Sequence, residues 1–182
     1  MKERAHLVID ASVARAAGGE GAKHPTARHC RDFLGAVLRI CHHAVLTAAG
    51  LAEWKKHRSR FARLWLASMY AKRKVDLAGE VMDAALKGKI LDTAASEKER
   101  AAMAKDLHLL DAALQTDRIV VSLDDAALGI FAKTSERVGE IREIVWINPA
   151  RAADGVIEWL EENTPAEEGR KLRAWMTQGG GR

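Results

Sequence analysis

The chain has 182 residues, about the length of one ordinary domain, which is enough to form a core without disulfides or structural metals. Hydrophobic residues make up 48% of it, but no uninterrupted apolar stretch is long enough to span a bilayer. The start of the chain leads straight into a short apolar run rather than into a secretory leader. We therefore expect a soluble, unexported protein with no membrane partner.

Cysteine content and charge indicate the compartment and the partners. Cys30 and Cys41 are the only cysteines, and their place on one predicted apolar helix face favours buried packing over a disulfide, which suits a reducing cytoplasm. The formal net charge is +4, yet residues 55–74 include eight basic side chains and no acid. The rest of the chain therefore has 21 basic against 25 acidic residues, so the basic excess is local.

The first half of the chain alternates short apolar runs with amphipathic segments. Its predicted elements are a strand at 6–9, a helix opened by Pro25, a strand at 44–47, a long helix from about Ala49 to Arg73 and a shorter helix at 77–86. The long helix is expected to have a basic outer face and an apolar inner face made of Trp54, Phe61, Leu64, Trp65 and Met69.

The second half continues the same alternation. Its predicted elements are a helix from a capping box at Ser96 to about Thr116, a strand at 118–122, a helix that starts at Asp124 and Asp125, a strand at 143–147 and a C-terminal helix around Val156 to Leu160. The glycine-rich end at 179–182 is expected to be disordered. No repeat or linker suggests a domain boundary.

Strands that alternate with helices predict an α/β fold, in which helices cover both faces of a mostly parallel sheet of four to five strands. We expect a three-layer α/β/α sandwich. Residues 1–150 would form the main domain, and residues 151–182 would be a helical extension and flexible tail of the same domain.

Acidic residues follow two of the predicted strands. In an open parallel sheet, ligands bind beyond the carboxyl ends of the strands, and Asp10 and Asp124 both lie there. Their carboxylates would meet if the two strands are close in the sheet. For each residue alone, capping of the following helix is the simpler interpretation.

Two further acids lie on predicted helices. Asp106 stands in the middle of a helix, where no cap is needed and where a half-buried carboxylate requires compensation by charge. Helical phase does not choose between Asp106 and Asp111, because both flank the apolar stripe at about equal angles. Glu53 lies near the start of the long helix, and a surface acid near a helix start is the alternative for it.

Crowded carboxylates repel one another, and a hard divalent cation with oxygen ligands relieves that repulsion. Mg²⁺ or Mn²⁺ fits best. Such an ion activates water and stabilises charge on a phosphoryl oxygen, so the acids point to phosphodiester chemistry.

Four segments, taken in order, resemble the PIN-domain ribonucleases. They are Val8–Ser12, Leu51–Trp54, Asp106–Leu114 and Ile119–Asp124. The resemblance implies a metal site formed by Asp10, Glu53, Asp106 and Asp124, and the family's spacing of eighteen residues before the last acid prefers Asp106 over Asp111.

The resemblance also implies supporting residues and partners. Ser12 and Ser122 match hydroxyl positions that support the site, Asp111 remains a supporting candidate, and Asp125 is a further candidate ligand beside Asp124. The resemblance implies an endoribonuclease that acts on RNA. The toxin role of a toxin–antitoxin pair, with an antitoxin as protein partner and a homodimer as assembly, is a further expectation from the same resemblance. The segment 74–95 and the tail after Pro149 make this chain longer than the compact toxin-type members of the family.

The basic face that begins next to Glu53 is a candidate backbone-binding track for RNA. Its proposed contact residues are Lys55, Lys56, Arg58, Arg60 and Arg63. A solvated helix face is the commoner meaning of such a run, and a non-catalytic PIN-like module that binds RNA or protein is the alternative function.

Other site chemistries have little support in the sequence. Ser12 stands where a haloacid-dehalogenase-type phosphatase would have its second Asp. Histidines and cysteines are present without the paired short spacings of a zinc site, and no glycine-rich nucleotide loop occurs.

Overall fold

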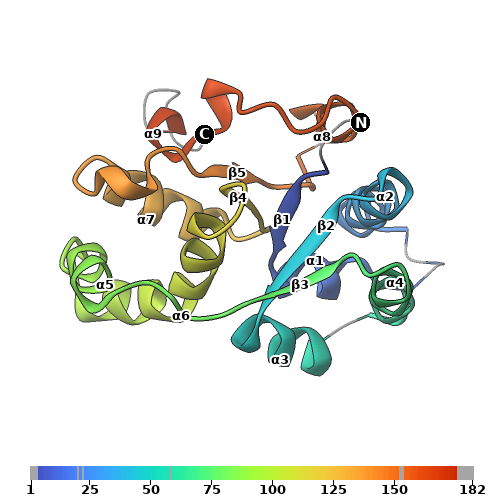
Figure 1. Ribbon diagram of the computed structural model, residues 1–182, viewed down its shortest axis with the longest axis horizontal. Helices are drawn as coiled ribbons and strands as arrows, with labels where there is room; N and C mark the ends of the chain where they lie inside the picture. The colour runs from blue at the N-terminus through green and yellow to red at the C-terminus, as the bar shows by residue number, and fades with distance from the viewer. Residues whose placement is uncertain (1–3, 20, 22, 58, 152–153, 176–182) are drawn as a thin grey trace.

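The computed structural model describes residues 4–19, 21, 23–57, 59–151 and 154–175. A five-stranded sheet runs through the centre of the molecule in the order β3-β2-β1-β4-β5 (Figure 1), and every neighbouring pair of strands is parallel. The strands are β1 (His6–Ile9), β2 (His43–Thr47), β3 (Val75–Ala78), β4 (Ile119–Val121) and β5 (Val145–Ile147).

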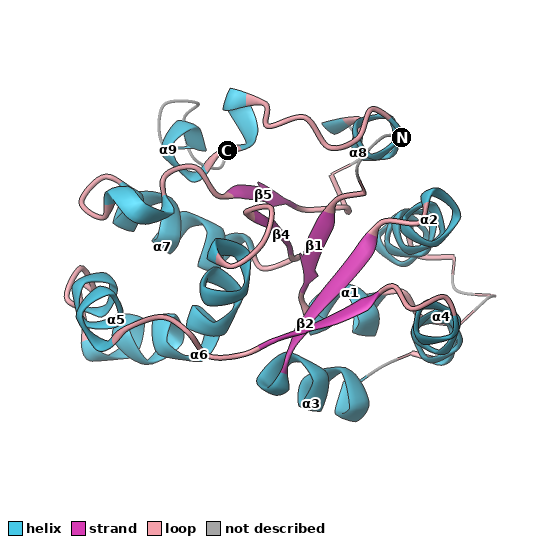
Figure 2. Cartoon of the chain, viewed as in Figure 1, coloured by secondary structure: helices cyan, strands magenta, loops and turns pink. Residues whose placement is uncertain are grey.

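Helices cover both faces of the sheet (Figure 2), so the predicted three-layer α/β/α sandwich is confirmed. One layer contains α1 (Ala11–Ala16), α2 (Pro25–Ile40), α3 (Ala48–His57), α4 (Arg60–Ala71) and α8 (Val156–Glu161). The other contains α5 (Ala84–Leu91), α6 (Glu97–Leu114), α7 (Asp125–Ser135) and α9 (Leu172–Trp175), with the short 3-10 turns η1 (Gly139–Ile141) and η3 (Glu168–Arg170) nearby.

The strands are apolar on both faces because each face has its own core. In β1, Leu7 and Ile9 pack into the core beneath α1 to α4, while Val8 packs into the core beneath α6 and α7. Two predicted helix starts are also confirmed. Ser96 accepts a hydrogen bond from the Glu99 N–H at the start of α6, and Asp124 accepts one from the Ala127 N–H at the start of α7.

The prediction of one long helix from Ala49 to Arg73 was wrong. The chain forms two helices, α3 and α4, and Ser59 caps the second by accepting a hydrogen bond from the Ala62 N–H. A capping serine in the middle of a continuous apolar pattern is therefore the physical cause of the break. Leu64, which was expected to face inward, is 51% exposed.

The prediction of a helix at 77–86 was also wrong. Residues 75–78 form the edge strand β3, paired with β2, and the helix α5 begins only after Asp83, whose carboxylate accepts the Leu86 N–H. Leu77 and Val81 are both largely exposed, so the apolar residues of this segment do not mark the buried face of a helix. Pairing with β2 therefore decided the conformation.

Both cysteines are free thiols. Cys30 is buried, but Cys41 is half-buried at the end of α2, in the left-handed conformation that closes the helix. The described residues 154–175 pack onto both layers, because Trp159 lies in one core and Leu172 in the other. Within the described part of the chain, no helix combines the length and the apolar character needed to cross a membrane. The expectation of disorder at 179–182 concerns residues outside the described ranges.

Candidate metal centre

The order of the strands brings two acids together. β1 and β4 are neighbours, and from this pair the chain proceeds outward in both directions, which makes their carboxyl ends the switch point of the sheet. Asp10 follows β1 directly, and its N–H bonds the Val121 carbonyl of β4 at 2.9 Å. Asp124 follows β4 and begins α7. The strand-end acids predicted from the sequence thus lie across one seam.

Two serine hydroxyls hold the carboxylate of Asp10. Ser12 Oγ lies 2.5 Å and Ser122 Oγ 2.9 Å from the same oxygen, Asp10 Oδ2. Each serine also accepts a backbone hydrogen bond, from Leu123 N to Ser12 and from Asp124 N to Ser122, both at 3.1 Å. Both hydroxyls bond Oδ2, and none of the described residues donates a hydrogen bond to the other oxygen, Asp10 Oδ1.

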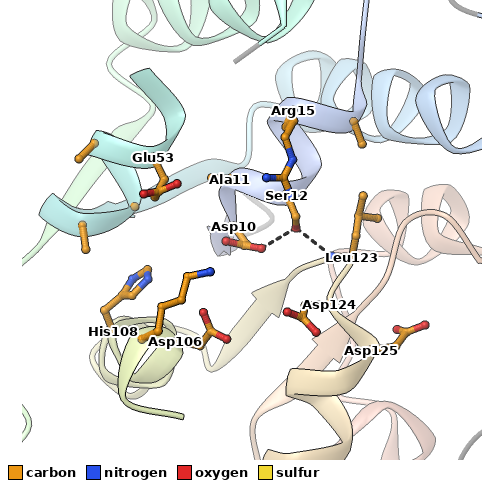
Figure 3. A pocket seen from close by; sticks show the side chains of 15 residues that line it. Asp10, Ala11, Ser12, Arg15, Glu53, Asp106, His108, Leu123, Asp124 and Asp125 are labelled. Atoms are coloured by element: carbon orange, nitrogen blue, oxygen red, sulfur yellow. Dashed lines mark hydrogen bonds between the residues drawn. The ribbon is translucent and has the colours of Figure 1, made fainter. Parts of the chain in front are cut away.

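Glu53 is positioned by the residue that follows it. The side chain of Trp54 is fully buried, and its indole N–H donates to the carbonyl of Ile9 at 3.1 Å, which ties α3 to the end of β1. Trp54 also stacks on Trp65 with ring centroids 5.6 Å apart. Glu53, one position earlier, is exposed and points toward the cleft beside Asp10 (Figure 3).

Asp106 enters the same cleft from α6, on the opposite side of the sheet. Its pKa is raised to about 6, mainly by burial; Lys105 lowers the pKa, and the nearby carboxylates of Asp10 and Asp124 raise it. The ionised form of Asp106 is therefore poorly compensated. A bound cation would remove this penalty.

The acids line one open cleft of about 630 Å³ (Figure 3). Asp124 Oδ1 accepts a hydrogen bond from the Ala127 N–H, and the described residues donate no hydrogen bond to the other oxygen of Asp124 or to either oxygen of Asp106. Asp10, Asp106 and Asp124 thus line the cleft, and each has at least one carboxylate oxygen to which the described residues donate no hydrogen bond. Carboxylate oxygens are the ligands that a hard divalent cation such as Mg²⁺ or Mn²⁺ prefers. Among the described residues, no three carboxylates of the cleft have ligand oxygens that all lie within 4.8 Å of one another, so the side chains would have to move closer together around an ion.

Two candidates from the sequence do not fit this cluster. Asp111 is buried away from the cleft, where its carboxylate accepts the N–H groups of Val81 and Met82 and so holds the loop before α5. Its expected supporting role at the metal site is corrected to a role in the fold. Asp125 lines the cleft, but Arg151 and Asn148 both bond its Oδ1 at 2.9 Å, and it points away from the other acids in Figure 3.

Three polar residues of the cleft were missed by the sequence analysis: Arg15, Lys105 and His108. Lys105 and His108 lie one turn apart on α6, and this helical spacing was the feature of the sequence that could have identified them as neighbours. The pKa of His108 is lowered mainly by burial, and its Nδ1 lies 2.7 Å from Thr47 Oγ1, which also accepts the Gly50 N–H at 2.9 Å. A side chain at Gly50 would meet Thr47 Oγ1 at 3.1 Å, so glycine permits this close approach.

The predicted RNA track is only partly continuous. Lys55 and Lys56 are exposed on α3 beside Glu53, while Arg60 and Arg63 are exposed on α4, beyond the break at Ser59. Arg58 lies outside the described residues. The four described basic side chains therefore belong to two helices rather than to one helix face.

Comparisons with models of known protein families, with curated proteins and with solved structures found no match for this chain. The resemblance to PIN-domain ribonucleases therefore rests on the residues themselves.

Proposed function

We propose that this protein is a divalent-metal-dependent endoribonuclease that hydrolyses phosphodiester bonds of RNA in the cleft beyond β1 and β4. The observation that carries the proposal is the convergence of Asp10, Asp106 and Asp124, from three separate elements, each with an oxygen to which the described residues donate no hydrogen bond. Mg²⁺ or Mn²⁺ is the proposed cofactor, with Glu53 as a further acid at the rim of the cleft. A bound ion would supply an activated water and neutralise charge on a phosphoryl oxygen.

The side chains around the acids have distinct roles in this proposal. Ser12 and Ser122 orient the carboxylate of Asp10 through its Oδ2. Asp106 must be ionised to hold a cation, and with a pKa of about 6 it is mostly ionised near neutral pH. His108, neutral because of its burial, offers a hydrogen-bonding group that adds no positive charge to the cation site.

Basic residues at the cleft are suited to the charge of an RNA backbone. Arg15 and Lys105 line the cleft itself, and Lys55 and Lys56 are exposed on the helix that carries Glu53. Contacts of this kind bind phosphate without reading bases, so the affinity should fall steeply as salt rises. The proposed substrate is therefore RNA bound through its backbone.

The test is cleavage of single-stranded and structured RNA with Mn²⁺ by the wild type, Asp10→Asn, Asp106→Asn and Asp125→Asn. We expect the first two variants to lose at least about a hundredfold in rate, since each removes a ligand charge. Asp125→Asn is the matched control, because its carboxylate is already engaged by Arg151 and Asn148, and it should retain most of the activity.

Equal cleavage by all four proteins would refute the proposal. RNA affinity that persists in EDTA, together with no cleavage under Mg²⁺ or Mn²⁺, would instead support a non-catalytic RNA-binding module. The two functions therefore give different results in one set of assays.

A further inference from the structure

A second cluster of metal-binding side chains lies at the opposite ends of the strands from the acidic cleft. His6 begins β1, His43 begins β2, and Asp76 is the second residue of β3. One ligand atom from each lies within 4.8 Å of the other two. All three side chains are half-buried, so the cluster is held by the fold and remains accessible to solvent.

The register of the sheet creates this cluster. His6 and His43 are direct partners in the β1–β2 pair, and their rings lie 4.5 Å apart between centroids. Asp76 Oδ2 lies 2.5 Å from His43 Nδ1 and 3.8 Å from His6 Nε2. In a tetrahedral site with bonds of about 2.0–2.1 Å, ligand atoms are about 3.3 Å apart, so small side-chain shifts suffice.

Asp117 fixes the orientation of the first histidine. Its Oδ2 lies 3.0 Å from His6 Nδ1 and also accepts the His6 backbone N–H at 2.7 Å. A carboxylate on Nδ1 keeps the proton there and directs the lone pair of Nε2 toward Asp76 and His43. Metal-binding histidines are commonly oriented by a carboxylate in this way.

Lys74 opposes metal binding at the second histidine. Its Nζ lies 2.9 Å from His43 Nε2, and because an ammonium group only donates, Nε2 accepts and Nδ1 carries the proton shared with Asp76. A metal on Nδ1 would move that proton to Nε2, and the contact with Lys74 would be lost. No net proton is released by the exchange.

We propose that His6, His43 and Asp76 form a binding site for a borderline transition-metal ion such as Zn²⁺ or Co²⁺, oriented by Asp117 and separate from the acidic cleft. Two imidazoles and one carboxylate favour such ions over Mg²⁺, which prefers all-oxygen sites. The ion would join the starts of three strands, including the edge strand β3, and would leave a coordination position open to solvent.

The experiment uses the full chain stripped with EDTA and then kept in excess Mg²⁺, which competes with Co²⁺ for all-oxygen sites such as the one proposed in the cleft. Co²⁺ is added, and visible d–d absorption reports binding and coordination number, with Zn²⁺ displacing it. We expect one equivalent to bind to the wild type and to the control His24→Gln, whose exposed side chain makes no cap hydrogen bond.

Variants of the cluster give the decisive comparisons. His43→Gln and Asp76→Asn should lose the site, and Asp117→Asn should weaken it by about 10–100-fold. Lys74→Gln should bind Co²⁺ more tightly than the wild type, a gain that misfolding would not produce. The proposal is overturned if the wild type binds no Co²⁺ under excess Mg²⁺, or if His43→Gln and Asp76→Asn bind it as the wild type does. RNA cleavage by the acidic cleft is independent of either result.

Discussion

The hydroxyl of Ser122 donates to Asp10 Oδ2 at 2.9 Å although the two residues are 112 positions apart in the sequence. The same hydroxyl accepts the Asp124 N–H, so one buried serine joins both strand-end aspartates across the seam between β4 and β1. The pair fixes one oxygen of Asp10 inside the protein and directs the other to the cleft.

Replacing Ser122 by alanine should therefore disturb the metal site. We expect Ser122→Ala to lower Mn²⁺ affinity by about 10–100-fold, as is usual when a group that orients a ligand is removed. Calorimetric titration measures this affinity. Ser68→Ala, which removes an exposed hydroxyl bonded within α4, is the control and should bind as the wild type does. Unchanged affinity in Ser122→Ala would show that Asp10 needs no such support.

Asp106 should limit the stability of the metal-free protein at neutral pH. Its pKa of about 6 in the folded state exceeds the ordinary value of 3.8, so the folded state binds more protons between these values. Wild-type stability therefore falls as pH rises through this window, and Asp106→Asn removes that loss. After allowance for partial exposure, the variant should be more stable by about 1–2 kcal/mol above about pH 7.

Urea unfolding in EDTA at several pH values measures this effect. The difference between the two proteins should vanish below about pH 4, where Asp106 is protonated in both states. Added Mn²⁺ should stabilise the wild type and leave Asp106→Asn almost unaffected. A wild type that is the more stable protein in EDTA at neutral pH would contradict the poor compensation of Asp106.

The strand-end acids could be predicted because local patterns define them. An apolar run that ends at Asp10 or shortly before Asp124 fixes the end of a strand, and in a parallel sheet those ends share one edge. The choice between Asp106 and Asp111 could not be derived from helical phase. It was decided by the loop at Val81 and Met82, which packs over Asp111 and which no local pattern specifies.

The wrong predictions about the fold have a similar origin. The pattern through Ser59 is apolar enough for one helix, and only the capping hydrogen bond to Ala62 shows that two helices meet there. β3 is an edge strand with the exposed Leu77, so its alternation is weak and its pairing with β2 is a tertiary effect. His108 was missed because its importance depends on Thr47, a residue far away in sequence.

Trp54 should affect the metal site more than its equally buried neighbour Trp65. Each indole N–H donates to a backbone carbonyl, Trp54 to Ile9 and Trp65 to Leu34. Trp54→Phe and Trp65→Phe should each cost about 1–3 kcal/mol of stability. Only Trp54→Phe should also weaken Mn²⁺ binding, because only Trp54 adjoins Glu53. Equal Mn²⁺ affinities in two folded variants would contradict this role of Trp54.

Arg15 should contribute to RNA binding through charge. Because it lines the cleft, Arg15→Gln should weaken binding to all RNA sequences alike and lower the slope of log affinity against log salt by about 0.7–1. Fluorescence anisotropy in Ca²⁺ or EDTA, at several salt concentrations, measures the slope without cleavage. Arg28→Gln on the outer surface of α2 is the control. An identical slope for Arg15→Gln and the wild type would remove Arg15 from the RNA contacts.

Asp10, Asp106 and Asp124 are proposed to hold one divalent cation. Crystals grown in EDTA and soaked in Mn²⁺, with data collected at the manganese absorption edge, test it most directly. We expect an anomalous peak in the cleft, within about 2.0–2.5 Å of an oxygen from each of the three aspartates, and none there in Asp106→Asn. A cleft without a peak in the wild type, under conditions where Mn²⁺ supports RNA cleavage, would contradict it.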